Sequence, residues 1–157
     1  MQHKSLADLP CPIARGLEHV GEWWSILILR DALRGHTRFD EFQKSLPIAP
    51  NMLTRRLAAL VESGLLARQQ YSTKPPRFEY TLTEAGLDFQ PVIAAIFAWG
   101  QKHYGPSAPR SQFVHRTTGE IAEPIVMDQK SGLPLASINF AFKRIAPADV
   151  PATDVTS

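Results

Sequence analysis

The sequence predicts an α+β fold that is mostly α-helical, and three features of the chain predict it. A helix-forming run over residues 50–63 carries two adjacent arginines, Arg55 and Arg56. Two short β-type runs follow it directly, at residues 66–71 and 77–82. Three further helix-forming runs precede this group and a long apolar one follows it. A helix followed by a basic hairpin is the layout of a winged helix-turn-helix domain.

Three helices are expected before this group. The first covers residues 12–20, because proline suits the first turn of a helix and a glycine follows the run. The second covers residues 22–33, which are apolar nearly all round, as in a helix buried in a core. Thr37 is expected to cap the third, over residues 38–46, which ends at Pro47.

The helix over residues 50–63 should have two distinct faces, since successive side chains are 100° apart. Its core stripe consists of Leu53, Leu57, Leu60 and Val61. The opposite face consists of Asn51, Met52, Arg55, Ala58, Ala59 and Glu62, with Thr54 and Arg56 on the flanks. Pro50 suits the first turn and Gly64 ends the helix. Two interpretations stay open: an ordinary amphipathic helix whose outer face is solvated, or a recognition helix whose small alanines allow a partner to approach closely.

The hairpin after this helix should carry positive charge at its tip. Residues 77–82 alternate polar and apolar side chains, as a half-buried strand does. Two prolines in the turn remove backbone donors, so the hairpin should project instead of extending a sheet. Lys74 and Arg77 flank these prolines, and residues 34–77 hold eight Lys or Arg against three Asp or Glu. A basic segment is often only a solvated face, but here it coincides with the helix and hairpin.

A long apolar helix is expected after the hairpin. Thr83 with Glu84 can cap it, and it would run to about Tyr104. Residues 92–99 have almost no polar face, so the helix needs a partner on each side. We expect it to pack on the first helix and, across a two-fold axis, on the same helix of a second subunit. The residues assigned to this dimer contact are Ile13, Leu17, Val92, Ile93, Ile96, Phe97 and Trp99.

The composition changes at residue 105, after which six of the thirteen prolines occur. We therefore expect a main domain over residues 11–104, a small β-rich extension over 105–146 and a disordered tail over 147–157. Short strands are expected at residues 113–116, 121–127 and 138–145. The apolar residues expected to form a small sheet beside the long helix are Phe113, Ile125, Leu135, Ile138, Phe140 and Phe142.

Composition also bounds the class of protein. No run approaches the ~18 apolar residues of a membrane span, and the first residues lack the apolar segment of a secretory signal. A single cysteine, Cys11, excludes an intrachain disulfide and favours a reducing compartment, so we expect a cytoplasmic protein. The five histidines are scattered, and the chain shows no carboxylate pair, phosphate-binding loop or nucleophile motif. Neither an enzyme nor a cofactor is expected.

Residues 11–86 carry an ordered set of motifs. They are Cys11-Pro12, Gly21, Trp24, the run 26–30, Gly35, Arg38-Phe39, Glu41, Leu53-Thr54, Arg56-Leu57, Leu60, Gly64-Leu65, Arg68, Tyr71, the run 75–77, Glu79-Tyr80, Leu82-Thr83 and Gly86. In these residues, about half of the chain, the sequence resembles the HxlR-type transcriptional regulators, a branch of the MarR-like winged-helix proteins. The resemblance implies a homodimeric repressor or activator that binds double-stranded DNA and has no catalytic activity. We expect a repressor, and the two-fold dimer implies a pseudo-palindromic operator.

Each candidate DNA-binding residue can be given a role. Asn51, Thr54 and Arg55 would face base edges, because Arg pairs with guanine and Asn with adenine. Met52 would touch a thymine methyl, beside Pro50 at the start of the helix. The residues expected to hold phosphates or the minor groove are Arg38, Arg56, Lys74 and Arg77. The alternative is a protein-interaction module that keeps the winged fold without reading DNA.

The chain departs from the family pattern in three places. Ala49 replaces a capping serine before the recognition helix, which costs roughly 1 kcal/mol, and Trp23 replaces a basic residue. In the extension, Thr118, Asp128 and Ser131 stand where some relatives have the cysteines of a zinc ribbon. Zinc prefers thiolate or imidazole ligands, so we expect a ribbon-like fold without a metal.

Cys11 has two interpretations. It precedes Pro12 at a helix start, where the helix dipole favours a thiolate. The resemblance implies a sensor of oxidants or electrophiles at this position, acting through an intersubunit disulfide or an adduct. The alternative is a small side chain packed under the dimer helix. The sequence does not identify an effector, whether oxidant or small molecule.

Overall fold

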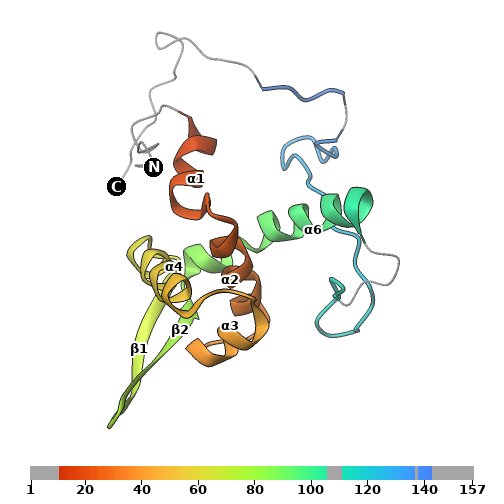
Figure 1. Cartoon of the computed structure of the whole chain (residues 1–157). Helices are drawn as coiled ribbons and strands as arrows, with labels where there is room; N and C mark the ends of the chain where they lie inside the picture. Colours follow the sequence, from red (N-terminus) through yellow and green to blue (C-terminus); the bar gives the residue numbers. More distant parts are fainter. Residues whose placement is uncertain (1–10, 106–110, 137, 143–157) are drawn as a thin grey trace.

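The computed structural model describes residues 11–105, 111–136 and 138–142. The helices and strands in these ranges are α1 (Pro12–Val20), α2 (Trp23–Leu33), α3 (Phe39–Ser45), α4 (Pro50–Glu62), β1 (Leu66–Thr73), β2 (Pro76–Leu82), α5 (Glu84–Leu87) and α6 (Gln90–Tyr104). The hairpin β1–β2 projects from the group of α2, α3 and α4, while α6 leads away on the other side (Figure 1). This arrangement confirms the mostly helical winged helix-turn-helix fold. Among the described helices, none has the length and apolar character needed to cross a membrane.

The core lies where α2, α3 and α4 meet at the base of the hairpin. Ile28 and Leu29 of α2 and Phe42 of α3 are completely buried. Against them lie the predicted stripe residues of α4, Leu53, Leu57 and Leu60, also completely buried. Burying each such side chain stabilises the fold by about 1.5–3 kcal/mol. The opposite face of α4 is therefore held outward.

The start of α3 differs from the prediction. Arg38, not Thr37, precedes the helix, and neither side chain caps it. The carboxylate of Glu41 instead reaches back and accepts hydrogen bonds of 2.8 Å from the backbone N–H groups of both Thr37 and Arg38. These two donors hold the pKa of Glu41 below its usual range, the Arg38 N–H having the larger effect. One carboxylate thus satisfies two backbone donors at the start of α3.

The hairpin is longer than predicted. Its strands are antiparallel with Leu66 opposite Leu82, and they continue to a tip of two residues, Lys74 and Pro75. The register shifts between Gln70 and Ser72, so Tyr71 is the extra residue of a bulge. The two prolines therefore restrict the tip and do not shorten the strands.

The predicted fifth helix is two helices. It was expected to run unbroken from Glu84 to about Tyr104, but α5 ends at Leu87 and α6 begins at Gln90. Pro91 is the reason, because it has no N–H to donate and its ring would clash with the carbonyl of Leu87 in a continuous helix. As predicted, the Thr83 hydroxyl caps α5, accepting from the Gly86 N–H at 3.1 Å.

The extension differs most from the prediction. The strands expected at residues 113–116 and 121–127 reduce to isolated bridges, Val114 with Ile121 and Met127 with Pro134. Prolines at 124 and 134 remove ladder donors, which explains why the pairing stops. The predicted small sheet is wrong: no strand forms in the described part of the extension, and Ile125, Ile138 and Phe142 are 69%, 99% and 96% exposed. The end of the strand expected at 138–145 and the tail expected at 147–157 lie outside the described residues.

Candidate nucleic-acid interface

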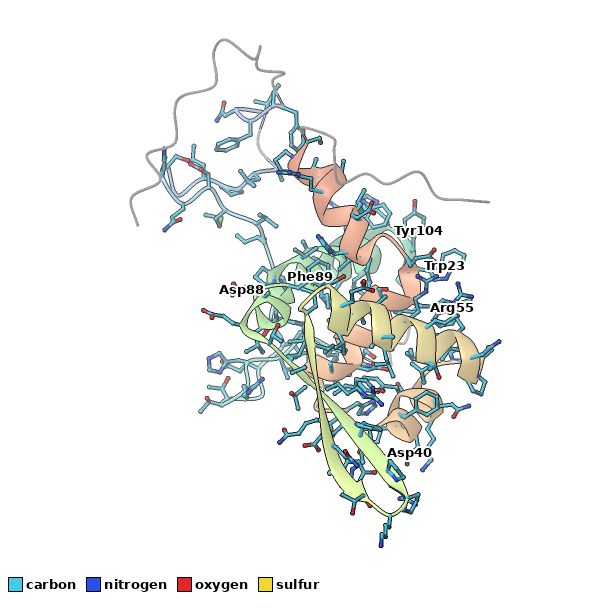
Figure 2. The ribbon with its side chains drawn as sticks, turned by 90° about the vertical axis from the view of Figure 1, so that its left-hand side faces the viewer. Trp23, Asp40, Arg55, Asp88, Phe89 and Tyr104 are labelled. Carbon is cyan, nitrogen blue, oxygen red and sulfur yellow. The ribbon has the colours of Figure 1, made fainter. Side chains whose placement is uncertain are left out.

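The outer face of α4 presents polar side chains to solvent. Asn51, Thr54, Arg55, Ala58 and Glu62 are exposed, as the helical periodicity predicted. Figure 2 shows Arg55 pointing outward from this helix. Because the guanidinium of Arg55 makes no hydrogen bond or ion pair that would hold it to the described part of the chain, its donors are available to a partner. The face can therefore offer hydrogen-bond donors to a groove.

Two polar residues near the start of α4 also make contacts within the helix. The Oδ1 of Asn51 accepts from the backbone N–H of Met52 at 2.8 Å, so it takes over part of the role of the missing capping serine. The Thr54 hydroxyl donates to the carbonyl of Pro50 at 2.9 Å. Asn51 keeps its amide donor for adenine, whereas Thr54 can offer an incoming base only its lone pairs and methyl group.

Met52 and Arg56 are less accessible than predicted. Met52 is half-buried and packs against the core. The Nη2 of Arg56 lies 3.3 Å from the Oε1 of Glu22, and the Arg56 side chain is 21% exposed. The ion pair joins α4 to the residue that precedes α2. Arg56 is therefore partly neutralised, which weakens the case for a direct phosphate contact.

Arg38 lies beside the hairpin. Its guanidinium stands over the ring of Tyr71, 4.7 Å from the centroid. The backbone beside it pairs with β2: the Tyr80 N–H donates to the Thr37 carbonyl at 2.7 Å, and Arg38 bridges to Glu79. This contact adds a short third segment to the sheet and brings Arg38 to the same element as Lys74 and Arg77.

The hairpin tip is exposed and braced. Lys74 and Arg77 are both exposed. The Ser72 hydroxyl donates to the carbonyl of Pro75 at 3.0 Å across the turn. Since this bond and the prolines restrict the turn, Lys74 is presented on a stiff support and loses less conformational entropy on binding.

Sequence reasoning missed two candidate contact residues. Arg68 is exposed on β1, and its guanidinium lies 3.5 Å from the centroid of the Phe78 ring, which fixes its direction. Trp23 is 73% exposed and lies on the same side of the molecule as Arg55 in Figure 2. Arg68 lies opposite Tyr80 in the hairpin and diagonally across from Phe78. Such a pair of an arginine and an aromatic residue on adjacent strands could have indicated Arg68 from the sequence. For Trp23 the signal was the departure from the family pattern, in which an aromatic residue replaces a basic one.

The predicted dimer residues divide into two groups. Five of them are between 44% and 58% exposed and form apolar patches on α1 and α6: Ile13, Leu17, Val92, Ile96 and Trp99. Two are turned inward, since Ile93 packs on the core and the Phe97 ring lies 6.2 Å from that of Phe113. Exposed apolar side chains of this kind are typical of a protein–protein contact. The expected packing of the long helix on the first helix is not seen in the described residues, because α1 packs mainly on α2 and α4.

Cys11 is exposed and precedes α1, which begins with Pro12. Its backbone carbonyl accepts from the Arg15 N–H at 3.0 Å, so the position at the helix start is as predicted. Both interpretations of this cysteine remain predictions.

The extension forms two turns of similar geometry. In one, the Thr118 N–H donates to Nδ1 of His115 at 3.2 Å and Gly119 has φ +73. In the other, the N–H and hydroxyl of Ser131 both donate to Asp128, at 2.8 and 2.7 Å. The Ser131 hydroxyl is the main reason that the pKa of Asp128 lies below its usual range. Hydrogen bonds within each turn thus involve the positions where a ribbon would hold metal ligands, and the described residues contain no group of three His, Cys, Asp or Glu able to hold a metal ion.

Comparisons with known proteins agree with this geometry. Residues 19–108 match the family model described as HxlR-like helix-turn-helix. The uncharacterized HTH-type transcriptional regulator Rv3095 of Mycobacterium tuberculosis is 43% identical over 113 residues, which are 71% of this chain and 72% of the relative.

Two solved structures assigned as transcription factors are also similar. PA1607 has a TM-score of 0.79 and 36% identity, covering 90% of this chain and 100% of the other. PA1374 from Pseudomonas aeruginosa has a TM-score of 0.61 and 50% identity, covering 90% and 96%. The chain therefore belongs to the HxlR-like helix-turn-helix family and is a transcriptional regulator of the helix-turn-helix type.

Proposed function

We propose that the protein is a homodimeric repressor that binds a pseudo-palindromic operator. The observation that carries the proposal is the exposure of Asn51 and Arg55 on α4 beside a projecting hairpin with Lys74 and Arg77 at its tip. In this arrangement α4 enters the major groove and the hairpin follows the backbone of the flanking DNA. Bound over a promoter, such a dimer would exclude polymerase. The function also implies a cytoplasmic location, where the DNA is accessible.

The residues divide into two roles. Asn51 and Arg55 read bases, with Thr54 and Met52 as apolar or accepting contacts close to Pro50. Arg38, Lys74 and Arg77 neutralise phosphates, which supplies register and salt-dependent affinity. Arg56 acts mainly by holding α4 against Glu22.

Dimerisation is the second part of the proposal. The exposed apolar residues of α1 and α6 would pair across a two-fold axis, so residues 11–104 form the DNA-binding and dimerisation unit and the extension lies outside it. The two α4 helices would then meet half-sites about one helical turn apart.

Selection of bound sites from random DNA, followed by gel-shift titration of the winning sequence, tests DNA recognition. The expected result is a motif with two-fold symmetry. If no sequence is enriched, and if DNA binding is weak and depends only on salt, the protein is instead a protein-interaction module.

Light scattering of wild type and Ile96→Asp tests the dimer. The wild type should have the mass of two chains at micromolar concentration. The variant should be monomeric, because a charge would be buried in the contact. Ile121→Asp, at a site 65% exposed on the extension, is the matched control and should stay dimeric. A monomeric wild type would overturn this part of the proposal.

A further inference from the structure

A cavity of about 620 Å³ lies between α2, α6 and residues 111–117 of the extension. This volume is within the range of small-molecule sites, about 300–1,000 Å³. About half of its lining residues belong to α2 and α6, and the extension supplies the others. The cavity therefore depends on residues 111–117, which lie against α2 and α6.

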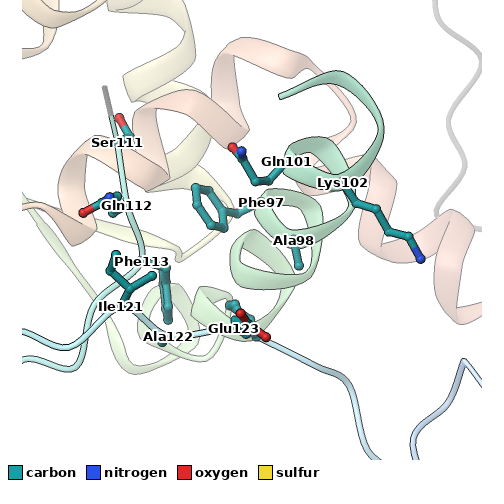
Figure 3. A pocket seen from close by; sticks show the side chains of 11 residues that line it. Phe97, Ala98, Gln101, Lys102, Ser111, Gln112, Phe113, Ile121, Ala122 and Glu123 are labelled. Atoms are coloured by element: carbon teal, nitrogen blue, oxygen red, sulfur yellow. The ribbon is translucent and has the colours of Figure 1, made fainter. Parts of the chain in front are cut away.

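Part of the cavity lining is apolar. Leu27 of α2, Ile93 and Phe97 of α6 and Phe113 of the extension line it. Figure 3 shows Phe97 and Phe113 beside the neighbouring, smaller hollow of about 400 Å³ that α6 forms with the extension. The paired rings form part of the wall of both spaces. This surface suits the hydrocarbon part of a ligand.

The lining of the cavity also includes basic side chains. Arg30, Arg34, His115 and Arg116 line it, and the described lining includes no Asp or Glu. Arg30 and Arg34 share one buried carboxylate, that of Asp31, at 2.9 and 3.3 Å. Two guanidinium groups on a single carboxylate keep one net positive charge, to which Arg116 adds another. The cavity therefore has an uncompensated charge that favours an anion.

Two details give these basic side chains a fixed geometry. The Nη2 of Arg34 donates to the Ser111 hydroxyl at 2.8 Å, which ties the extension to α2. The Nδ1 of His115 accepts from the Thr118 N–H, so the proton of a neutral imidazole is on Nε2, where it can donate. Donors from α2 and from the extension thus border one space.

We propose that this cavity binds a small organic anion, a carboxylate on an aromatic or aliphatic body. The apolar wall takes the body, and Arg34 and Arg116 take the carboxylate through charge-assisted hydrogen bonds. That such a ligand acts as the effector of this regulator rests on the proposed function.

The position of the cavity indicates how the ligand would act. Its α2 wall packs against α4 and is linked to it through Glu22 and Arg56, while its α6 wall carries part of the proposed dimer contact. A ligand wedged between α2 and α6 shifts DNA affinity only if it binds one relative position of these helices better than the other.

Calorimetric titration of the full chain with 2-naphthoate and with its neutral isostere 2-naphthamide tests the site. Naphthoate should bind once per chain. The amide should bind at least about tenfold more weakly, since it lacks the charge. Naphthoate that fails to bind, or an amide that binds equally well, would overturn the proposal.

Variants locate the binding. Arg34→Gln and Arg116→Gln should each weaken naphthoate binding by about tenfold. Ser111→Ala removes the hydroxyl to which Arg34 donates but keeps the cation, so it should weaken naphthoate binding less than Arg34→Gln does. Arg68→Gln, an arginine stacked on the hairpin away from the cavity, is the matched control. Equal losses in Arg68→Gln and Arg116→Gln would show nonspecific attraction and refute the site.

A gel shift with and without saturating naphthoate then tests the effector role. Because calorimetry uses no DNA, a failure to bind an operator would leave the ligand site intact. Conversely, naphthoate that binds without changing operator affinity would refute only the effector role.

Discussion

Glu22 and Arg56 form an ion pair of 3.3 Å between the residue that precedes α2 and the middle of α4. The two adjacent arginines of α4 consequently have different surroundings. The Nε of Arg56 is buried and has no hydrogen-bond partner among the described residues, whereas Arg55 is exposed. One arginine therefore positions the helix that the other uses to reach DNA.

The positioning role predicts a loss of stability. Arg56→Met keeps the apolar stem but removes the charge, so it should lower the free energy of unfolding by about 0.5–1 kcal/mol, the scale of a partly exposed ion pair. Urea titration measures this change. The salt dependence of DNA binding should not change. A flatter salt dependence at unchanged stability would instead show that Arg56 contacts a phosphate, as the sequence alone suggested.

Arg55 should determine base preference. Arg55→Ala should lose about 1–3 kcal/mol of operator binding and relax the preference at one position of each half-site, because a bidentate contact to guanine is lost. Gel-shift titrations against the operator and single-base variants measure both effects. An Arg55→Ala protein with the affinity and selectivity of wild type would refute the orientation assigned to α4.

Lys74 should affect all DNA sequences alike. Lys74→Ala at the hairpin tip should weaken specific and random DNA to a similar degree and flatten the slope of log affinity against log salt by ~1–2 units per dimer. Lys130→Ala, an exposed lysine of the extension, is the control and should leave the slope unchanged. A loss confined to one sequence would mean that the hairpin reads bases.

Glu41 should make stability depend on pH in the acidic range. Its pKa is lower in the folded protein because the N–H groups of Arg38 and Thr37 donate to the carboxylate. Its stabilising effect is therefore complete above the unfolded pKa of about 4.3 and is lost as the pH falls through the folded pKa.

This effect can be tested by comparing the free energy of unfolding of wild type with that of Glu41→Gln, which keeps the shape of the side chain. Their difference in unfolding free energy should shrink as the pH falls from 6 toward 3, and urea titrations at several pH values measure it. Asp40→Asn is the control: the side chain of Asp40 is 65% exposed and it pairs with Lys44 only at 3.8 Å, so its difference should be small throughout. A Glu41→Gln difference that does not vary with pH would contradict the capping role.

The sequence predicted what depends on local periodicity. Leu53, Leu57 and Leu60 lie four and three residues apart, so their burial and the exposure of Arg55 follow from helix geometry. The sequence could not predict the pairing of Arg56 with Glu22, because the partner lies 34 positions away and only the tertiary fold brings them together. The break before Pro91 was predictable in principle, but the apolar character of residues 92–99 concealed it.

The extension was predicted least well. Alternation of apolar and polar residues at 138–142 favoured a strand, yet these side chains find no sheet to pack on, and Ile138 and Phe142 are almost fully exposed. A strand forms only where a partner strand supplies hydrogen bonds. Of the apolar residues expected beside the long helix, Phe113 does lie against α6, where its ring contacts that of Phe97.

The extension should hold no structural metal. In its two turns, the acceptors His115 Nδ1 and Asp128 Oδ2 already receive hydrogen bonds from Thr118 and Ser131. Zinc in a structural site requires four ligands, usually thiolate or imidazole, and these positions supply one imidazole and one carboxylate. Elemental analysis of the purified protein should find no stoichiometric zinc, and a chelator should leave the melting temperature unchanged. One zinc per chain that survives dialysis and is released only on unfolding would show that Thr118, Asp128 and Ser131 have been misread.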